Sequence, residues 1–154
     1  MANAGSPEMK VIEHIHIDKP PEDVWSVVSD PSTHTAWRPA LAEFRHVSNG
    51  PLAVGSHIRE KIRWRGRTIE IDDVVTALEP PRRLGVRGGW RAADFELDFL
   101  LDPSNGGTLV SFDWSFLPKT LVMRLATPLL GRALRGATKD ELAGLKSHVE
   151  NKPR

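Results

Sequence analysis

Two acidic residues interrupt the apolar face of two adjacent predicted strands, and together they could move protons. Residues 56–64 and 67–78 alternate apolar and polar side chains with a period of two, as half-buried strands do. Glu60 and Asp73 fall on the apolar side of that alternation. Loss of water raises the pKa of a carboxyl group, and a second carboxyl nearby raises it further, which suits a general acid or base. We therefore predict Glu60 and Asp73 as candidate catalytic residues; the alternative is that each pairs with an inner basic residue or lies near water at a splayed edge.

The register of these two strands follows from their charges. A shift by one residue would turn one of the two apolar faces toward water. In the favoured register, Glu60 lies diagonal to Asp73, and both acids face one interior. A turn at residues 65–66 then brings opposite charges together twice on the outer face, Lys61 with Glu70 and Arg59 with Asp72.

Large apolar side chains share the face that carries the two acids. Aromatic rings offer flat, rigid surface to a polycyclic ligand, but they would pack on one another equally well in a plain core, because pockets and cores have similar compositions. The predicted ligand-binding residues are Trp37, Ile58, Ile62, Trp64, Ile71, Trp90, Phe95, Leu97, Phe99, Phe112, Trp114, Leu130 and Leu134.

Several other chemistries find no support in the sequence. The absence of cysteine excludes disulfides, thiol nucleophiles and cysteine-zinc sites. His14 and His16 lie two residues apart without a recognisable set of further ligands, so we predict surface histidines and no metal site. No phosphate-binding, nucleophile-elbow or dinucleotide motif occurs, and we expect no cofactor. The basic residues at 59–67 share their sheet with acidic ones, so we expect no nucleic-acid partner.

The elements that carry these residues follow an α+β order. Pro20-Pro21-Glu22-Asp23 opens a helix, and a second short helix ends near Trp37. Apolar residues recur at spacings of three and four from Leu130 to Val149, which predicts a long C-terminal helix that Pro128 kinks or divides from a short first segment. Seven strands are expected at residues 10–18, 41–47, 56–64, 67–78, 82–88, 94–101 and 108–117.

Length and composition indicate one globular domain. The 154 residues carry 21 basic and 20 acidic side chains, and a net charge of +1 provides no overall field for anionic partners. We expect residues 1–8 to form a loose tail and residues 9–150 a single ligand-binding domain. Without a signal peptide or an apolar run of bilayer length, we expect a cytoplasmic monomer or homodimer with no integral membrane association.

A family resemblance adds to this pattern and covers residues 11–150. The chain resembles the START-like (SRPBCC) helix-grip superfamily, specifically its polyketide cyclase/dehydrase and lipid-transport family. The residues that carry the resemblance are 17–25, Ser29-Asp30-Pro31, Trp37-Arg38-Pro39, Val54-Gly55-Ser56, 78–84, Gly107-Thr108-Leu109-Val110 and 142–146.

The resemblance implies a fold and a class of ligand. A curved antiparallel sheet of about seven strands would wrap around the C-terminal helix, with two short helices after the first strand and a cavity between sheet and helix. That cavity would bind or carry a lipid-like or polyketide-like hydrophobic molecule. The alternative is a polyketide aromatase/cyclase in which Glu60 or Asp73 moves a proton, and a third hypothesis is a protein-interaction module.

Overall fold

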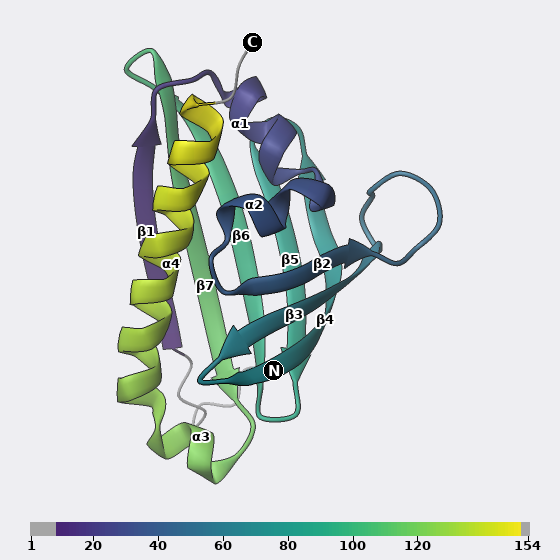
Figure 1. Ribbon diagram of the computed structural model, residues 1–154, viewed down its shortest axis with the longest axis vertical. Helices are drawn as coiled ribbons and strands as arrows, with labels where there is room; N and C mark the ends of the chain where they lie inside the picture. The colour runs from purple at the N-terminus through teal and green to yellow at the C-terminus, as the bar shows by residue number, and fades with distance from the viewer. Residues whose placement is uncertain (1–8, 152–154) are drawn as a thin grey trace.

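A curved sheet and a long helix that lies along its β1 edge dominate the computed structural model, which describes residues 9–151 (Figure 1). The predicted tail at residues 1–8 lies outside the described residues. The α+β class and the helix-grip architecture are confirmed. The elements in chain order are β1 (Met9–Ile17), α1 (Pro21–Val28), a 3-10 turn (Pro31–Thr33), α2 (His34–Trp37), β2 (Leu41–His46), β3 (His57–Trp64), β4 (Arg67–Glu79), β5 (Arg83–Trp90), β6 (Ala93–Ser104), β7 (Gly107–Pro118), α3 (Leu121–Leu125) and α4 (Thr127–Glu150).

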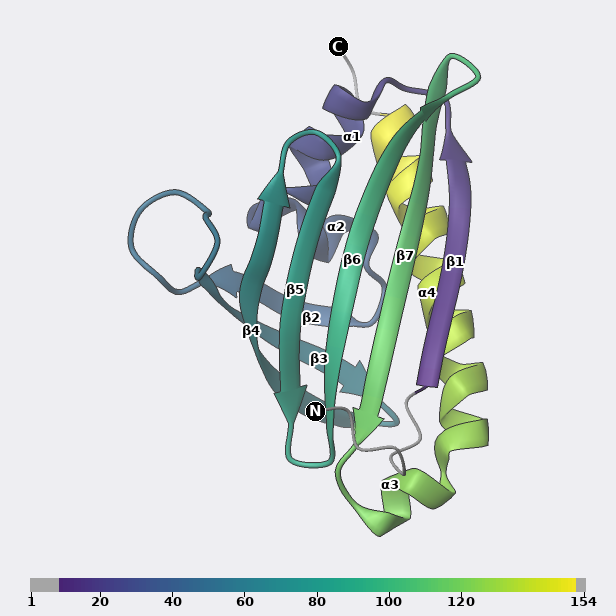
Figure 2. The same ribbon diagram turned by 180° about the vertical axis from the view of Figure 1, so that it is seen from behind.

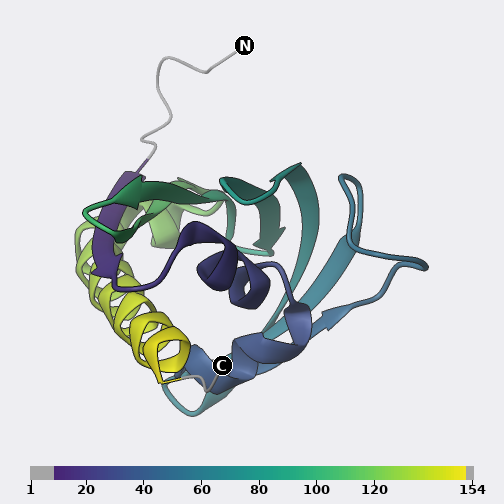
Figure 3. The ribbon, with the colours of Figure 1, turned by 90° about the horizontal axis from the view of Figure 1, so that it is seen from above.

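The sheet is antiparallel throughout, with strand order β1-β7-β6-β5-β4-β3-β2 (Figure 2). Its two edges curl toward each other. Helix α4 packs along β1 at one edge, and α2 packs between α4 and β2 at the other. Seen from above, these elements form a ring that α1 covers at one end (Figure 3). Buried Val24, Val27 and Val28 anchor α1 there.

Tight turns fix the hairpin registers. Arg65 and Gly66 both have positive φ angles, 50° and 75°, which suit a two-residue turn between β3 and β4. The predicted register is confirmed: the outer face pairs Lys61 with Glu70 and Arg59 with Asp72. The nitrogen–oxygen distances of these ion pairs are 3.7 Å and 3.3 Å.

Prolines begin two of the helices, as the sequence predicts. Pro20 stands at the N-cap of α1, and Pro21 is its first residue. Pro128 lies in the first turn of α4, where its missing N–H removes no helical hydrogen bond. The chain is therefore divided between α3 and α4 at Ala126, which confirms the division predicted from Pro128.

Burial changes along α4. All of its buried side chains lie from the middle of the helix onward: Thr138, Leu142, Leu145 and Val149. In the N-terminal half, Leu130 and Leu134 are half-buried and Leu129 is exposed. The helix thus closes on the core at the α1 end and stands more open at the α3 end. No helix within residues 9–151 is long and apolar enough to cross a bilayer.

Two glycines of α4 should respond oppositely to alanine. A Cβ on Gly144 would overlap the carbonyl oxygen of Trp37, so Gly144→Ala should destabilise the fold by about 1–3 kcal/mol through overpacking. A Cβ on exposed Gly136 meets nothing within 4 Å, so Gly136→Ala should stabilise it by about 1 kcal/mol. Urea unfolding measures both changes, and equal responses would contradict the close approach of α2 to α4.

Candidate functional site

Arg38 holds two glutamates from different elements on the inner side of the sheet. It follows the last residue of α2, and its side chain is almost fully buried. Its Nη2 lies 2.7 Å from Oε1 of Glu60 on β3, and its Nε donates to Oε1 of Glu141 on α4 at 3.3 Å. One cation thereby ties α2 to the sheet and to the long helix. Burial disfavours its charge, but Glu141 and Glu60 outweigh that effect and raise the pKa of Arg38.

A buried histidine supports this arginine. The His34 ring stacks on Phe44 with centroids 4.1 Å apart, and its Nε2 donates to the Val28 carbonyl oxygen at 2.8 Å. Nδ1 therefore carries the lone pair, which accepts from Arg38 Nη1 at 3.4 Å. Burial and then the nearby Arg38 lower the pKa of His34 to about 3. His34 is accordingly neutral near pH 7 and acts as a spacer between α1 and Arg38.

Asp73 lies beside this network on β4, with only 1% of its surface exposed. Its neighbour on β5 is Gly88, and a Cβ at that position would overlap the Asp73 Oδ1 atom. The missing side chain of Gly88 therefore provides the space that the carboxyl group occupies. Glu60 lies diagonal to it on β3, as the predicted register requires.

The two carboxyl groups have pKa values that move apart. Burial, a hydrogen bond with Glu60 and the charge of Glu60 raise the pKa of Asp73 to about 10. Burial opposes ionisation of Glu60 as well, but Arg38 and the hydrogen bond with Asp73 lower its pKa overall. The pair therefore carries one proton near neutral pH, held on Asp73 and donated toward Glu60.

Some buried polar atoms on the inner face have no hydrogen-bond partner among the described residues. The Asp73 proton is directed at Glu60, but neither Asp73 oxygen accepts a hydrogen bond from the described residues, and within the same range the buried Trp114 Nε1 has no acceptor. Leaving such groups unpaired costs free energy, about 1–3 kcal/mol each. A ligand with a hydroxyl or carbonyl group could satisfy them.

The predicted apolar lining divides into two zones. Over most of the sheet the lining side chains are buried and pack on one another. The ring centroids of Phe99 and Phe112 are 4.5 Å apart, and those of Phe95 and Trp114 are 5.3 Å apart. At the α3 end the side chains are half-buried. The buried group comprises Trp37, Ile58, Ile71, Phe95, Leu97, Phe99, Phe112 and Trp114, and the half-buried group Ile62, Trp90, Leu130 and Leu134.

Trp64 departs from the expected inner lining. It has the inner-face parity of β3 but is 49% exposed. It lies at the last position of the strand, directly before the turn, where Arg65 packs over its ring at 5.1 Å. The hairpin end extends past the covered part of the sheet, so period-two alternation alone overestimates the burial of Trp64.

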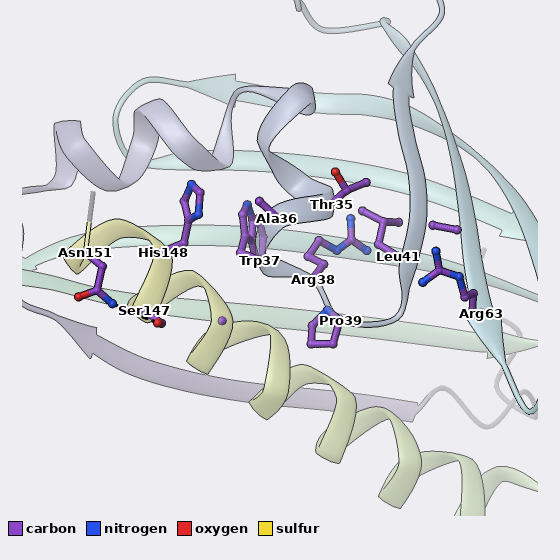
Figure 4. Close-up of a pocket in the computed structure, with 12 residues that line it drawn as sticks. Thr35, Ala36, Trp37, Arg38, Pro39, Leu41, Arg63, Ser147, His148 and Asn151 are labelled. Carbon is purple, nitrogen blue, oxygen red and sulfur yellow. Dashed lines mark hydrogen bonds between the residues drawn. The ribbon is translucent and has the colours of Figure 1, made fainter. Parts of the chain in front are cut away.

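A pocket of about 760 Å³ lies outside this inner face (Figure 4). Its lining residues come from α2, the start of β2 and the C-terminal half of α4, with Arg63 from β3. Of the predicted ligand-binding residues, Trp37 alone lines it. The other lining residues are Thr35, Ala36, Arg38, Pro39, Leu41, Ala42, Arg63, Gly144, Ser147, His148 and Asn151.

Sequence reasoning missed Arg38, His34 and Glu141 as members of the site. His34 begins a helix of four residues and Arg38 directly follows it, and so short a helix has no periodicity that could assign a face. Glu141 precedes Leu142 on the apolar side of α4, and its place within that stripe was the available signal. Glu60 has therefore found an inner basic partner, one of the alternatives considered, whereas Asp73 has none.

Acid should weaken the fold through His34. Because its folded pKa lies below the ordinary value of 6.5, the unfolded chain takes up a proton that the folded chain refuses as the pH falls. This contribution is fully present above pH 6.5, and about 2 kcal/mol of it should be lost between pH 7 and pH 5. His34→Gln should flatten the pH dependence of urea unfolding over that interval, whereas exposed His14→Gln should not.

The fold and the inner-face site define a helix-grip protein. The chain belongs to the polyketide cyclase/dehydrase and lipid transport family, whose model matches residues 8–150. Among curated proteins no match is found.

Solved structures share the fold at low sequence identity. The Zhui aromatase/cyclase from Streptomyces sp. R1128 has a TM-score of 0.83 at 13% identity, with 96% of this chain and 97% of that chain covered. The di-domain aromatase/cyclase BexL has a TM-score of 0.78 at 16% identity, with 95% and 51% covered. Ara h 8.0201 has a TM-score of 0.73 at 12% identity, with 95% and 100% covered.

Proposed function

We propose that the protein binds a small hydrophobic molecule between the sheet and α4, with a polar group of the ligand directed at Asp73 and Trp114. The observation that carries this proposal is the unused hydrogen-bonding capacity of the Asp73 oxygens and of Trp114 Nε1, which lie among the apolar side chains of the inner face. Ligand pockets combine such apolar linings with a few polar groups that fix orientation. Family membership supports the same class of ligand.

The ligand would enter at the α3 end. The inner-face side chains are half-buried there, including Ile62, Ile69 and Trp90 from the sheet and Leu130 and Leu134 from α4. Apolar surface that still contacts water gains free energy when a ligand covers it, about 25 cal/mol per Å². At the opposite end α1 buries its valines against the core, which leaves the α3 end as the more accessible side.

Two substitutions on one helix test the location. Leu134→Trp would fill the inner face, and Ser147→Trp would fill the outer pocket of Figure 4. Native mass spectrometry of the purified protein first shows which apolar compound copurifies, and fluorescence titration with 1-anilinonaphthalene-8-sulfonate measures binding. We expect Leu134→Trp to weaken dye binding about tenfold or more while Ser147→Trp leaves it unchanged. The reverse pattern would move the site to the outer pocket.

A second candidate function is aldol cyclisation of a polyketide, favoured by the unequal protonation of the two acids. The neutral Asp73 would donate its proton to the carbonyl oxygen under attack, and the Glu60 carboxylate would accept the proton lost from the attacking carbon. Transfer of that proton from Glu60 to Asp73 would restore both groups. Two proteins of similar structure, Zhui and BexL, are named aromatase/cyclases.

Substitution of Asp73 separates binding from catalysis. Asp73→Asn retains a hydrogen-bond donor but cannot release a proton at neutral pH. If the protein is a cyclase, this variant should bind a poly-β-ketone substrate with unchanged affinity and cyclise it at least about a hundredfold more slowly. Absence of turnover by the unchanged protein would leave binding as the function.

A further inference from the structure

Four large aliphatic side chains project into water at one end of the molecule. Leu121, Val122, Leu125 and Leu129 are 70%, 77%, 75% and 73% exposed, and together they form what we term the apolar tip. They belong to α3 and the first turn of α4, which lie at the extreme end of the ribbon (Figure 1). Single exposed apolar residues are ordinary, but a group of this size marks an interaction surface.

Within the segment that carries the apolar tip, the charged residues have one sign. Between Pro118 and Asp140 every charged residue is basic, five in all: Lys119, Arg124, Arg132, Arg135 and Lys139. Lys119 pairs with Asp94 and Arg135 with Glu13. Arg124 and Arg132 are exposed, and neither is ion-paired within residues 9–151. The rest of the chain balances this local excess, because the net charge of the whole is +1.

We propose that the apolar tip docks on an anionic lipid bilayer. Aliphatic side chains flanked by arginines suit the interface of a membrane, where the former enter the acyl boundary and the latter meet anionic headgroups. A protein partner needs a face of roughly 800 Å² on each side, and a protruding end of two short helical segments offers little flat area. The bilayer therefore fits this surface better than a second copy of the chain.

Docking at this end would bring the membrane to the half-buried inner face. Leu130 and Leu134 follow the apolar tip on α4, and Met123 of α3 packs against the same core. A hydrophobic ligand could then pass between bilayer and protein without crossing water. The docking itself does not depend on the identity of that ligand.

Vesicle flotation tests the proposal. Full-length protein is mixed with phosphatidylcholine vesicles that either contain or lack phosphatidylserine. We expect flotation with the anionic vesicles, weakened by salt. Leu121→Ser/Leu125→Ser should reduce binding about tenfold or more. Arg124→Gln/Arg132→Gln should reduce it about 25-fold, since each basic residue near an anionic membrane contributes about fivefold. Val54→Ser, at a 64% exposed residue of the β2–β3 loop, is the matched control and should bind normally.

Other outcomes overturn the proposal. Failure of the unchanged protein to float with either vesicle would do so, as would an equal loss in the Val54→Ser control. A concentration-dependent dimer that the leucine variants abolish would assign the apolar tip to a second copy. Dye binding in vesicle-free solution is measured on the same variants. A variant that still binds the dye but no longer floats with vesicles would show that membrane docking and the proposed ligand site are separate.

Discussion

Replacement of Arg38 by methionine should lower the free energy of unfolding by about 3–5 kcal/mol, because it leaves carboxylates buried without their counter-charge. Glu60 and Glu141 both lie against this guanidinium, and Asp73 is adjacent to Glu60. Because methionine and arginine have similar volumes, the loss of stability would come more from the missing charge than from changed packing. Urea denaturation monitored by tryptophan fluorescence measures it.

Two controls keep the Arg38 result interpretable. Arg83→Met removes a surface arginine that pairs with Asp98 at 3.0 Å, and such exposed pairs contribute only about 0–1 kcal/mol. Arg38→Met/Glu60→Gln removes the cation together with one anion and should recover part of the loss. An Arg38→Met protein as stable as the Arg83→Met protein would show that the buried ion pairs contribute little.

Asp73→Asn should change the pH dependence of stability more than any other single substitution. The pKa of Asp73 is raised from 3.8 to about 10, so the folded protein retains a proton that the unfolded chain has lost. The corresponding stability is fully present below about pH 4 and is lost as the pH rises toward 10, at up to about 1.4 kcal/mol per pH unit. Asparagine has no proton to lose, so Asp73→Asn should become the more stable protein as the solution is made alkaline.

Asp72→Asn is the matched control for Asp73→Asn. Asp72 is the preceding residue on β4 and faces water with its partner Arg59. Urea unfolding from pH 5 to pH 9 should give parallel curves for Asp72→Asn and the unchanged protein and a flatter curve for Asp73→Asn. Parallel curves for all three would mean that Asp73 ionises normally in the folded state.

The sheet and its hairpins could be predicted because local rules determine them. Period-two alternation located the strands, and the turn at residues 65–66 together with the charges on either side fixed the β3–β4 register. The break before α4 followed from the missing N–H of Pro128. The shared face of Glu60 and Asp73 follows from that same register, so these two members of the polar site could be predicted from pattern alone.

The rest of the site depends on packing between segments distant in the sequence. Arg38 reaches Glu141 across 103 positions, and no local pattern encodes that contact. His34 is buried because α1 and Phe44 enclose it. Trp64 is exposed because the end of the β3–β4 hairpin extends beyond the part of the sheet that other elements cover. These outcomes depend on how far the sheet curls, a property of all seven strands together.

The Asp73 carboxyl group occupies the space that a side chain at position 88 would need, so substitutions at these two positions should constrain each other during evolution. A mutation that gives position 88 a side chain should be tolerated only after position 73 has become smaller, so the order of the two changes matters. Across relatives, residue volumes at the two positions should vary inversely. Libraries that vary Asp73 to alter ligand preference should therefore randomise Gly88 in the same step.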